Sequence, residues 1–590
     1  MPIRTIATTK NKKRLIITFV IFVALMVGLC FRVGYIQIVK SDDYTQRAMK
    51  QQTKDEVVEA KRGAITDRYG QELAASVTCY SVWIRPAAIA TGKTKEAKEA
   101  QLNRAAHKIA DITGTSRAKM EDLFAQKKSL IKVAKYLSRE KADKVRKAGI
   151  DGVSLTEQSK RSYPAGNFAS HVLGSVTDDN SGLSGLELYY NSYLKGVPGR
   201  WIQAKDVSGN PLLYGEQKYY KAQDGDSIEL TIDSFIQLQA EESIKKTYNR
   251  YKAKRVSCVV MNPKNGEILA MASTPGFDPN NSREPRSADK SAFKAMNSRQ
   301  QLNYLNKMWR NPLTSDTYVP GSTFKLLTTS MALEEDKTTL NEHFYDKGYI
   351  DIAGTRLKCW RYTNPHGSEN LEQAVGNSCN PVFAELATRL GINKFYAYLD
   401  LFGITERTGI DYPGEATSQL QNIKTAGPVG IATMGYGQGI AVTPIQLITA
   451  EASFGNGGMM MQPHLVKKIT DSQGKTVKEF KAEKVRQTVS AETSKQICRT
   501  MEYVVNKGGA EKAQIKGYRV GGKTGTSNEE ANGNKITASF IGMAPMDDPQ
   551  MIILYIVERP QGEIYGSTVA APGAREVMEK SLRHLKIQPN

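Results

Sequence analysis

One apolar segment dominates the start of the chain. Residues 15–31 (LIITFVIFVALMVGLCF) carry no charge, and apolar side chains resume after Arg32 through Ile38. This length is at the short end of what a hydrocarbon core of about 30 Å requires, and an arginine near a helix end can extend its charge to the membrane interface. The pattern predicts a membrane-spanning helix over residues 15–36.

The remaining apolar runs predict strands and helices in alternation. They are, in chain order, a strand at 76–84, helices within 93–147, a strand at 227–233, a helix from Ser234, a hairpin around the Pro-Lys-Asn-Gly turn at 263–266, strands at 538–545 and 550–558, and a helix at 574–585. Strands therefore stand at both ends of the second part of the chain. This order predicts an α/β domain whose sheet is assembled from distant segments, and a domain boundary near residue 225.

Basic residues stand in front of the apolar segment. They are Arg4, Lys10, Lys12, Lys13 and Arg14, and no acidic residue occurs before Asp42. By the positive-inside rule, residues 1–14 are expected in the cytoplasm and the bulk of the chain outside, after a single crossing of the cell membrane. Cleavage as a signal peptide is disfavoured because the segment ends in bulky Leu29, Cys30 and Phe31 instead of small residues. The prediction is an uncleaved signal anchor.

Composition and charge narrow the classes of function. The 590 residues include 81 Lys and Arg against 60 Asp and Glu, a net charge of +21, and 40% are hydrophobic. This size predicts two to four domains, and the hydrophobic content excludes wholesale disorder. The basic excess indicates an anionic partner. For an anchored chain outside the cytoplasm, an anionic membrane or a phosphate-bearing substrate fits better than nucleic acid, for which no binding motif is present.

The cysteine and histidine spacings argue against a disulfide scaffold and against a zinc site. The six cysteines stand far apart without a C-x-x-C motif, and the six histidines never pair at i, i+3 or i+4. The sequence therefore predicts no metal and no cofactor.

The first candidate catalytic residue along the chain is Ser322. Pro320-Gly321 breaks the chain, and the apolar run that follows is long enough for a helix that would start at or near Ser322. Lys325 lies on the same helical face, and partial burial would lower the pKa of its amine so that it can take the serine proton. The spacing alone is weak evidence, because Ser-x-x-Lys recurs at several other serines of the chain.

Two further motifs follow in order. Ser-Cys-Asn at 378–380 forms a turn into another apolar helix, and Lys-Thr-Gly-Thr at 523–526 follows two glycines. Glycine lets a strand edge approach a ligand closely, and a lysine with two hydroxyls can bind a carboxylate. The three motifs in this order form a strong combined signal.

These motifs resemble those of penicillin-binding proteins and serine β-lactamases. The rest of the chain is similar to class B high-molecular-weight penicillin-binding proteins, and within them to the septal and sporulation branch. The similar segments are RGAITDRYGQELA, RSYPAGNFASHVLG and GLELYYNSYLKGVPG of the N-terminal pedestal, and LKCWRYTNPHG and GYGQGIAVTPIQL of the transpeptidase domain. The resemblance implies a mixed α/β pedestal of the dimerisation type at 37–225 and an α/β (α+β) transpeptidase domain with a serine β-lactamase-like fold at 226–590.

The resemblance also assigns roles to individual residues. The implied catalytic residues are Ser322 as nucleophile, Lys325 as general base, Ser378 in proton relay, Asn380 on the substrate backbone and Lys523 at the substrate carboxylate. The implied substrate-binding residues are Thr524, Gly525 and Thr526, with an oxyanion hole from the N–H groups of Ser322 and Thr526. Trp360 either lines the cleft or packs.

The implied activity is a D,D-transpeptidase that cross-links peptidoglycan stem peptides through an acyl-serine, releases D-Ala and is inhibited by β-lactams. Implied partners are the lipid-linked precursor, a SEDS-family glycosyltransferase and division proteins. A role in septation, sporulation or elongation and the identity of the acceptor amine stay open.

Four alternatives remain. A β-lactamase needs neither pedestal nor anchor, whereas a β-lactam-tolerant penicillin-binding protein would keep both. A non-catalytic division scaffold would not need the intact serine and lysines, and a β-lactam sensor would need more than 14 residues before the span.

Overall fold

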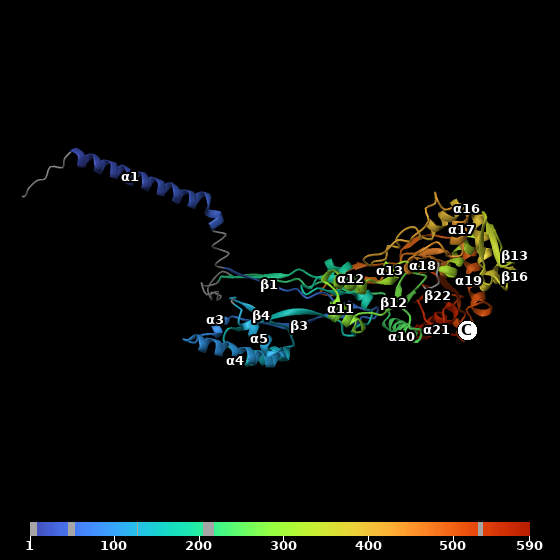
Figure 1. The fold of residues 1–590 in the computed structure, drawn as a ribbon, viewed down its shortest axis with the longest axis horizontal. Helices are drawn as coiled ribbons and strands as arrows, with labels where there is room; N and C mark the ends of the chain where they lie inside the picture. Colours follow the sequence, from blue (N-terminus) through green and yellow to red (C-terminus); the bar gives the residue numbers. More distant parts are fainter. Residues whose placement is uncertain (1–8, 45–52, 127, 205–216, 529–534, 590) are drawn as a thin grey trace, which may run out of the picture. The chain divides into compact units, whose positions relative to one another are not determined.

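The computed structural model describes residues 9–44, 53–126, 128–204, 217–528 and 535–589. The chain divides into two compact units, which are Met1–Ala60 with Val197–Gln223, and Lys61–Gly196 with Asp224–Asn590. Figure 1 labels their elements along the chain.

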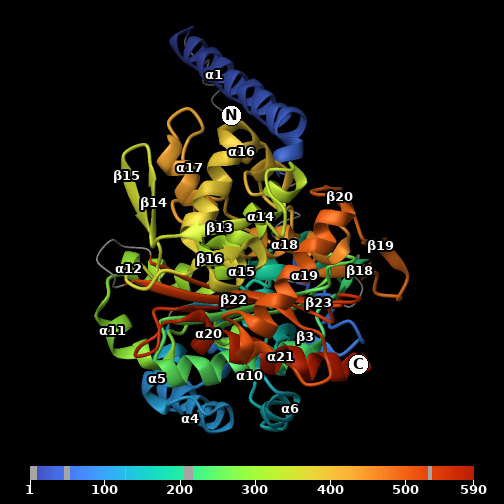
Figure 2. The ribbon, with the colours of Figure 1, turned by 90° about the vertical axis from the view of Figure 1, so that its right-hand side faces the viewer.

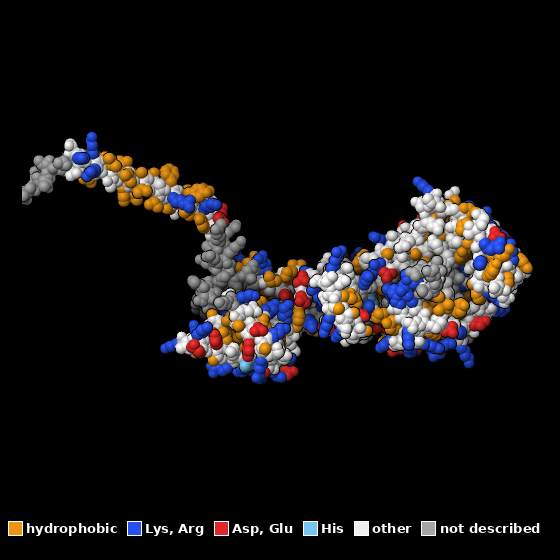
Figure 3. All heavy atoms as spheres, in the orientation of Figure 1, with side chains coloured by type: hydrophobic (Ala, Val, Ile, Leu, Met, Phe, Trp, Pro, Cys, Tyr) orange, Lys and Arg blue, Asp and Glu red, His pale blue; other side chains and the backbone are white. Residues whose placement is uncertain are grey.

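The first unit contains the apolar helix predicted near the N-terminus. Helix α1 (Thr9–Gly34) continues into the short π-helix η1 (Tyr35–Val39), and together they are the one segment of the described chain that is long and apolar enough to cross a membrane. Apolar side chains cover the middle of α1, with basic side chains toward both of its ends (Figure 3). A helix that is apolar all round is suited to contact with lipid.

A small antiparallel sheet completes the first unit. Its order is β1 (Thr53–Val58), β8 (Gly199–Ala204) and β9 (Gln217–Tyr220). It joins segments from both ends of the expected pedestal.

The second unit is built around a five-stranded antiparallel sheet. Its order is β12 (Ile268–Thr274), β11 (Arg255–Met261), β23 (Met551–Glu558), β22 (Ile536–Ala544) and β21 (Gly521–Asn528). The predicted hairpin and the two predicted C-terminal strands are all present. Strands far apart in the sequence lie side by side, which confirms the α/β domain with a sheet assembled from distant segments. Its inner strands are buried almost throughout.

Helices cover both faces of this sheet. On one face lie α10 (Ser234–Tyr251) and α21 (Ala571–His584), and on the other lie α18 (Pro444–Ala452) and α19 (Ala491–Lys507) (Figure 2). Helix α14 (Lys325–Glu334), which begins with the first motif's lysine, packs against α19 and against α16 (Asn380–Leu401), which begins with the second motif's asparagine. A three-layer arrangement of this kind buries the apolar runs of the strands from both sides.

A second sheet joins the pedestal segment to the rest of the second unit. Its order is β19 (Thr476–Glu479), β18 (Val466–Thr470), β10 (Ser227–Leu230), β2 (Ile65–Thr66), β3 (Glu72–Ile84) and β4 (Ile131–Leu137), with β5 (Val153–Ser162) also paired to β3. The domain boundary that the sequence predicts near residue 225 falls just before β10, and it stays a prediction. The sequence predicted only helices within 93–147, whereas β4 lies between α5 (Arg117–Phe124) and α6 (Arg139–Lys147). Its short alternating pattern was missed between two longer helical ones.

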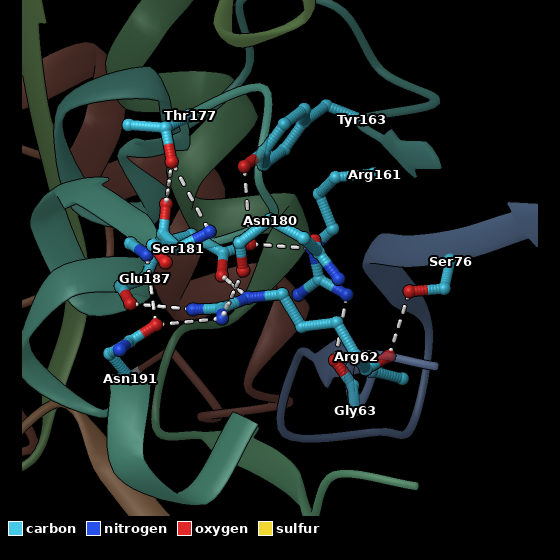
Figure 4. A network of polar contacts seen from close by, with 12 residues as sticks. Arg62, Gly63, Ser76, Arg161, Tyr163, Thr177, Asn180, Ser181, Glu187 and Asn191 are labelled. Atoms are coloured by element: carbon cyan, nitrogen blue, oxygen red, sulfur yellow. Dashed lines mark hydrogen bonds and ion pairs between the residues drawn. The ribbon is translucent and has the colours of Figure 1, made fainter. Parts of the chain in front are cut away.

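A buried ion-pair network ties the pedestal segment together (Figure 4). Glu187, fully buried in the short helix α8 (Gly185–Tyr189), accepts from Arg62 Nε at 2.5 Å and from Arg161 Nε at 2.6 Å. It also accepts from the Tyr163 hydroxyl at 3.1 Å. Burial acts to raise the pKa of Glu187, but the two guanidinium groups outweigh it and hold this pKa below its usual value.

We predict that Glu187→Gln destabilises the protein by about 3–5 kcal/mol, because it leaves two buried guanidinium groups without their counter-charge. The matched control is Glu140→Gln, which breaks an exposed pair with Lys144 on α6 and should change little. Thermal unfolding of the full-length protein in detergent measures the difference. Equal melting temperatures for the two variants would contradict the role assigned to the network.

Candidate active site

Ser322 lies in a single 3-10 turn, η4 (Gly321–Phe324), that leads directly into α14. Gly321 has a left-handed φ of 57°, and its N–H donates to Gly437 O at 3.0 Å. A Cβ on Gly437 would stand 1.9 Å from Gly321 O, so only glycine allows this backbone contact. The serine turn is therefore held in place by close contact with the Gly-Tyr-Gly-Gln-Gly segment.

Lys325 is the first residue of α14, one helical turn after Ser322, and it is fully buried. Its Nζ donates to Ser378 O at 2.7 Å, to Ser378 Oγ at 3.1 Å and to Asn380 Oδ1 at 2.8 Å. The amine also stands 5.0 Å from the centre of the Phe383 ring. The first and second motifs are thus joined through one amine.

Lys523, of the third motif, contacts the same serine, Ser378. It lies on β21 with 1% of its surface exposed, and its Nζ donates to Ser378 Oγ at 3.2 Å and to Thr524 O at 2.9 Å. The hydroxyl of Ser378 consequently accepts from two buried lysines, Lys325 and Lys523. The predicted catalytic residues Lys325, Ser378, Asn380 and Lys523 are brought together by these contacts.

Ser378 reaches this position through an uncommon backbone conformation. It follows α15 (Leu371–Asn377) with φ 57° and ψ 42°, in the left-handed region that non-glycine residues seldom adopt. Such a conformation costs of order 1 kcal/mol or more, and it persists where surrounding contacts hold it. Here the two lysines and the start of α16 hold the turn.

Burial also sets the protonation of the two lysines. It lowers the pKa of Lys325 to about 7, because an ammonium is disfavoured away from water. The thiols of Cys379 and Cys359 and the carboxyl of Glu369 act in the opposite direction but more weakly. Burial, followed by repulsion from Lys325, lowers the pKa of Lys523 far below its ordinary value. The site therefore offers an amine that can exchange a proton near neutral pH.

The strand β21 presents its threonines on the face opposite Lys523. Side chains alternate along a strand, so Thr524 and Thr526 share one face, and both are partly exposed. Gly525 faces the serine turn, where a Cβ would stand 2.9 Å from Pro320 O and 2.5 Å from Ser539 Oγ. The glycine is what lets this strand lie directly against η4.

Trp360 lies at the second motif with 61% of its surface exposed. Its Nε1 donates to Asn377 O at 3.1 Å, one residue before Ser378. Of the two expectations, lining the cleft or packing in a core, this exposure favours a surface role.

Sequence reasoning missed two groups around the site. One is Gly437, for which the repeated glycines of its segment were a usable signal of close backbone approach. The other is Glu451 of α18, which is fully buried with no hydrogen-bond partner for its carboxyl among the described residues. Burial raises its pKa well above the usual value, with Lys523 acting in the opposite direction. A lone acidic residue within the apolar run of this helix was the signal.

Comparison with known families agrees with this geometry. Residues 256–579 match the model of the penicillin binding protein transpeptidase domain, and residues 57–230 match that of the penicillin-binding protein dimerisation domain. The chain belongs to the penicillin-binding protein transpeptidase family.

Individual relatives cover nearly the whole chain. Stage V sporulation protein D of Bacillus subtilis (strain 168) is 37% identical over 586 residues, 98% of this chain and 86% of that relative. The probable peptidoglycan D,D-transpeptidase PenA of Neisseria meningitidis is 30% identical over 576 residues, 96% of this chain and 91% of that relative. The crystal structure of penicillin binding protein 2X from Streptococcus thermophilus superposes with a TM-score of 0.72 at 25% identity, covering 90% of this chain and 80% of that one.

We predict that Gly525→Ala lowers the rate of acylation by a fluorescent penicillin about 100-fold, because a displacement of the serine turn by about 1 Å is enough for such a loss. The matched control is Gly427→Ala, since a Cβ there would meet nothing within 4 Å. Rates are compared at equal amounts of folded protein, judged by thermal unfolding. An unchanged rate in Gly525→Ala would show that the close contact between β21 and η4 does not position the serine.

Proposed function

We propose that this protein is a peptidoglycan D,D-transpeptidase that works through an acyl-serine on Ser322. The observation that carries the proposal is the convergence of two buried lysines on Ser378 Oγ. One of them, Lys325, lies one helical turn after Ser322. The family membership and the name of the Neisseria relative support the same reaction.

Acylation begins with removal of the Ser322 proton. An ammonium has three donors, and loss of one proton leaves Lys325 with a lone pair that can accept the hydrogen of Ser322 Oγ. The serine oxygen then attacks the carbonyl carbon of the penultimate D-Ala in a donor stem peptide. The N–H groups of Ser322 and Thr526 would stabilise the resulting oxyanion.

Departure of the terminal D-Ala needs a proton on its nitrogen. Ser378 Oγ, which contacts both lysines, can pass the proton that Lys325 took from Ser322 from this ammonium to the leaving nitrogen as the C–N bond breaks. An acceptor amine from a second stem peptide then attacks the ester, and Ser322 recovers its proton by the reverse path.

Substrate contacts follow from the remaining motif residues. Thr524 and Thr526, on one face of β21, suit the terminal carboxylate, and Gly525 keeps this strand against the serine turn. The family resemblance places Lys523 at the same carboxylate; because its Nζ donates to Ser378 Oγ at 3.2 Å, Lys523 is proposed to act through Ser378 instead. Asn380 Oδ1 is held by Lys325, which directs its amide group toward the peptide backbone of the substrate. Trp360 forms part of the rim.

The anchor and the partners complete the proposal. The apolar helix α1 anchors the protein in the membrane. The basic residues before it place the N-terminus in the cytoplasm and the catalytic domain outside. A SEDS-type glycosyltransferase and division proteins are the expected partners, and the names of the relatives are consistent with a role in sporulation or division. β-Lactams would acylate Ser322 as substrate mimics.

We predict that Ser322→Ala abolishes labelling by a fluorescent penicillin, because the attacking oxygen is removed. The matched control is Ser472→Ala, which removes an exposed serine from another Ser-x-x-Lys sequence and should label like the wild type. Gel fluorescence of the full-length protein measures this. Equal labelling of Ser322→Ala would refute the assignment, and rapid release of label from the wild type would instead indicate a β-lactamase.

We predict that the acylation rate falls as pH falls through about 7, the value to which burial lowers the pKa of Lys325. The amine is the reactive form and predominates above this pKa, so one pH unit below it the rate should be about a tenth of the plateau. Stopped-flow or quenched labelling between pH 5.5 and 9 measures the profile. A rate that keeps rising to pH 9 and beyond would contradict a neutral Lys325 as the base.

A further inference from the structure

A β-hairpin lies between the first and second motifs in the sequence. It is formed by β14 (Tyr349–Ile352) and β15 (Thr355–Lys358), which pair antiparallel. Figure 2 shows it projecting beside α17 (Pro428–Gly435), against which β14 packs, and both strands also pack against α16. The reaction proposed above uses none of the side chains of this hairpin.

Three cationic side chains of the hairpin and its flanks are held on two tyrosine rings. The guanidinium carbon of Arg356 lies 3.9 Å from the centre of the Tyr349 ring, and Lys347 Nζ lies 4.6 Å from the same centre. Lys358 Nζ lies 4.6 Å from the centre of the Tyr362 ring, which is itself 6.1 Å from the centre of the Tyr349 ring. Attraction to an aromatic face restrains a cation that would otherwise move freely. We call these five side chains the hairpin patch.

The chain itself neutralises only part of the charge of the hairpin patch. Lys347, Arg356 and Lys358 are all exposed. Asp351 pairs with Arg356 at 3.0 Å, and about half of each of these two side chains stays in contact with solvent. Within the described part of the chain, neither of the two lysines forms an ion pair with a carboxylate. Exposed cations that gather in this way attract an anionic ligand.

The hairpin patch adjoins the second catalytic motif through Trp360. Strand β15 ends at Lys358, two residues before this tryptophan, and Trp360 Nε1 donates to Asn377 O directly before Ser378. The side chains of Trp360 and Tyr362 are 61% and 40% exposed, so aromatic surface connects the patch to the motif. The patch therefore belongs to the second motif's part of the site, whereas the threonines proposed to hold the terminal carboxylate belong to the third.

We propose that the hairpin patch binds the stem peptide of a peptidoglycan strand through carboxylates on the residues that precede its two D-Ala. This inference rests on the proposed transpeptidase function, which brings such a peptide to Ser322. Acidic residues before the D-Ala pair make the peptide complementary in charge to the patch. An anionic lipid surface would be complementary as well, but the position of the patch next to the second motif favours the substrate.

The patch would act on the binding of the substrate and not on the chemical step. Individual exposed ion pairs are weak, so the three cations together are expected to change the affinity for the peptide about tenfold. A penicillin lacks the residues that precede D-Ala-D-Ala. Its reaction with Ser322 should therefore not depend on the patch.

The test uses the full-length protein in detergent and measures how well a stem peptide protects Ser322 from a fluorescent penicillin. The probes are a synthetic stem pentapeptide with free carboxylates before its two D-Ala, and the same peptide with these carboxylates amidated. In the wild type the free form should give half-protection at about a tenth of the concentration that the amidated form needs. This difference should shrink as salt is added.

The variant that tests the patch is the triple substitution Lys347→Gln, Arg356→Gln and Lys358→Gln. The two peptides should protect it equally, while its rate of labelling by penicillin stays that of the wild type. The matched control removes three exposed lysines at the start of α4 (Lys95–Thr113), by Lys93→Gln, Lys95→Gln and Lys98→Gln, and should behave like the wild type.

The comparison of the two peptides on the wild type needs no variant, so it holds even if a variant folds poorly. Equal protection of the wild type by both forms, the absence of protection by either, or an undiminished difference in the hairpin variant would each overturn the proposal. Binding to anionic vesicles that the hairpin variant loses, with its peptide protection unchanged, would assign the patch to lipid instead. Failure of the proposed function would appear separately, as a wild type that penicillin does not label.

Discussion

The removal of two amines from water around a single hydroxyl is the constraint on which the site depends. Lys325 and Lys523 are both buried and both donate to Ser378 Oγ, and neither has a carboxylate hydrogen-bonded to it among the described residues. Desolvation therefore acts with little compensation and brings the pKa of Lys325 into the neutral range. Without such burial an ammonium is favoured, and a lysine in that form could not serve as a base.

Keeping this arrangement requires backbone contacts that few residues allow. Gly437 allows the backbone of its segment to contact Gly321 of the serine turn, and Gly525 allows β21 to contact the same turn at Pro320. Ser378 has a left-handed backbone conformation at the end of α15. The constrained backbone positions therefore lie in three short segments. The five-stranded sheet pairs strands from the beginning and the end of the catalytic domain, and it holds these segments in place.

The sequence predicted the parts of this structure that local patterns determine. The apolar anchor, the β11–β12 hairpin, the two C-terminal strands and the order of the three motifs were all recognisable. Pairing of β10 with β18 was not, because it joins strands far apart in the chain and leaves no periodic trace. The burial of Glu187 likewise depends on two arginines that are distant in sequence.

In the proposed mechanism the buried amines activate Ser322 Oγ and no other nucleophile. Peptide mapping of the penicillin-treated full-length protein by mass spectrometry tests it most directly, because it locates the new covalent bond on the chain. We expect a single penicilloyl adduct, on the peptide that contains Ser322. An adduct on any other residue, or a protein that stays unmodified while folded, would contradict it.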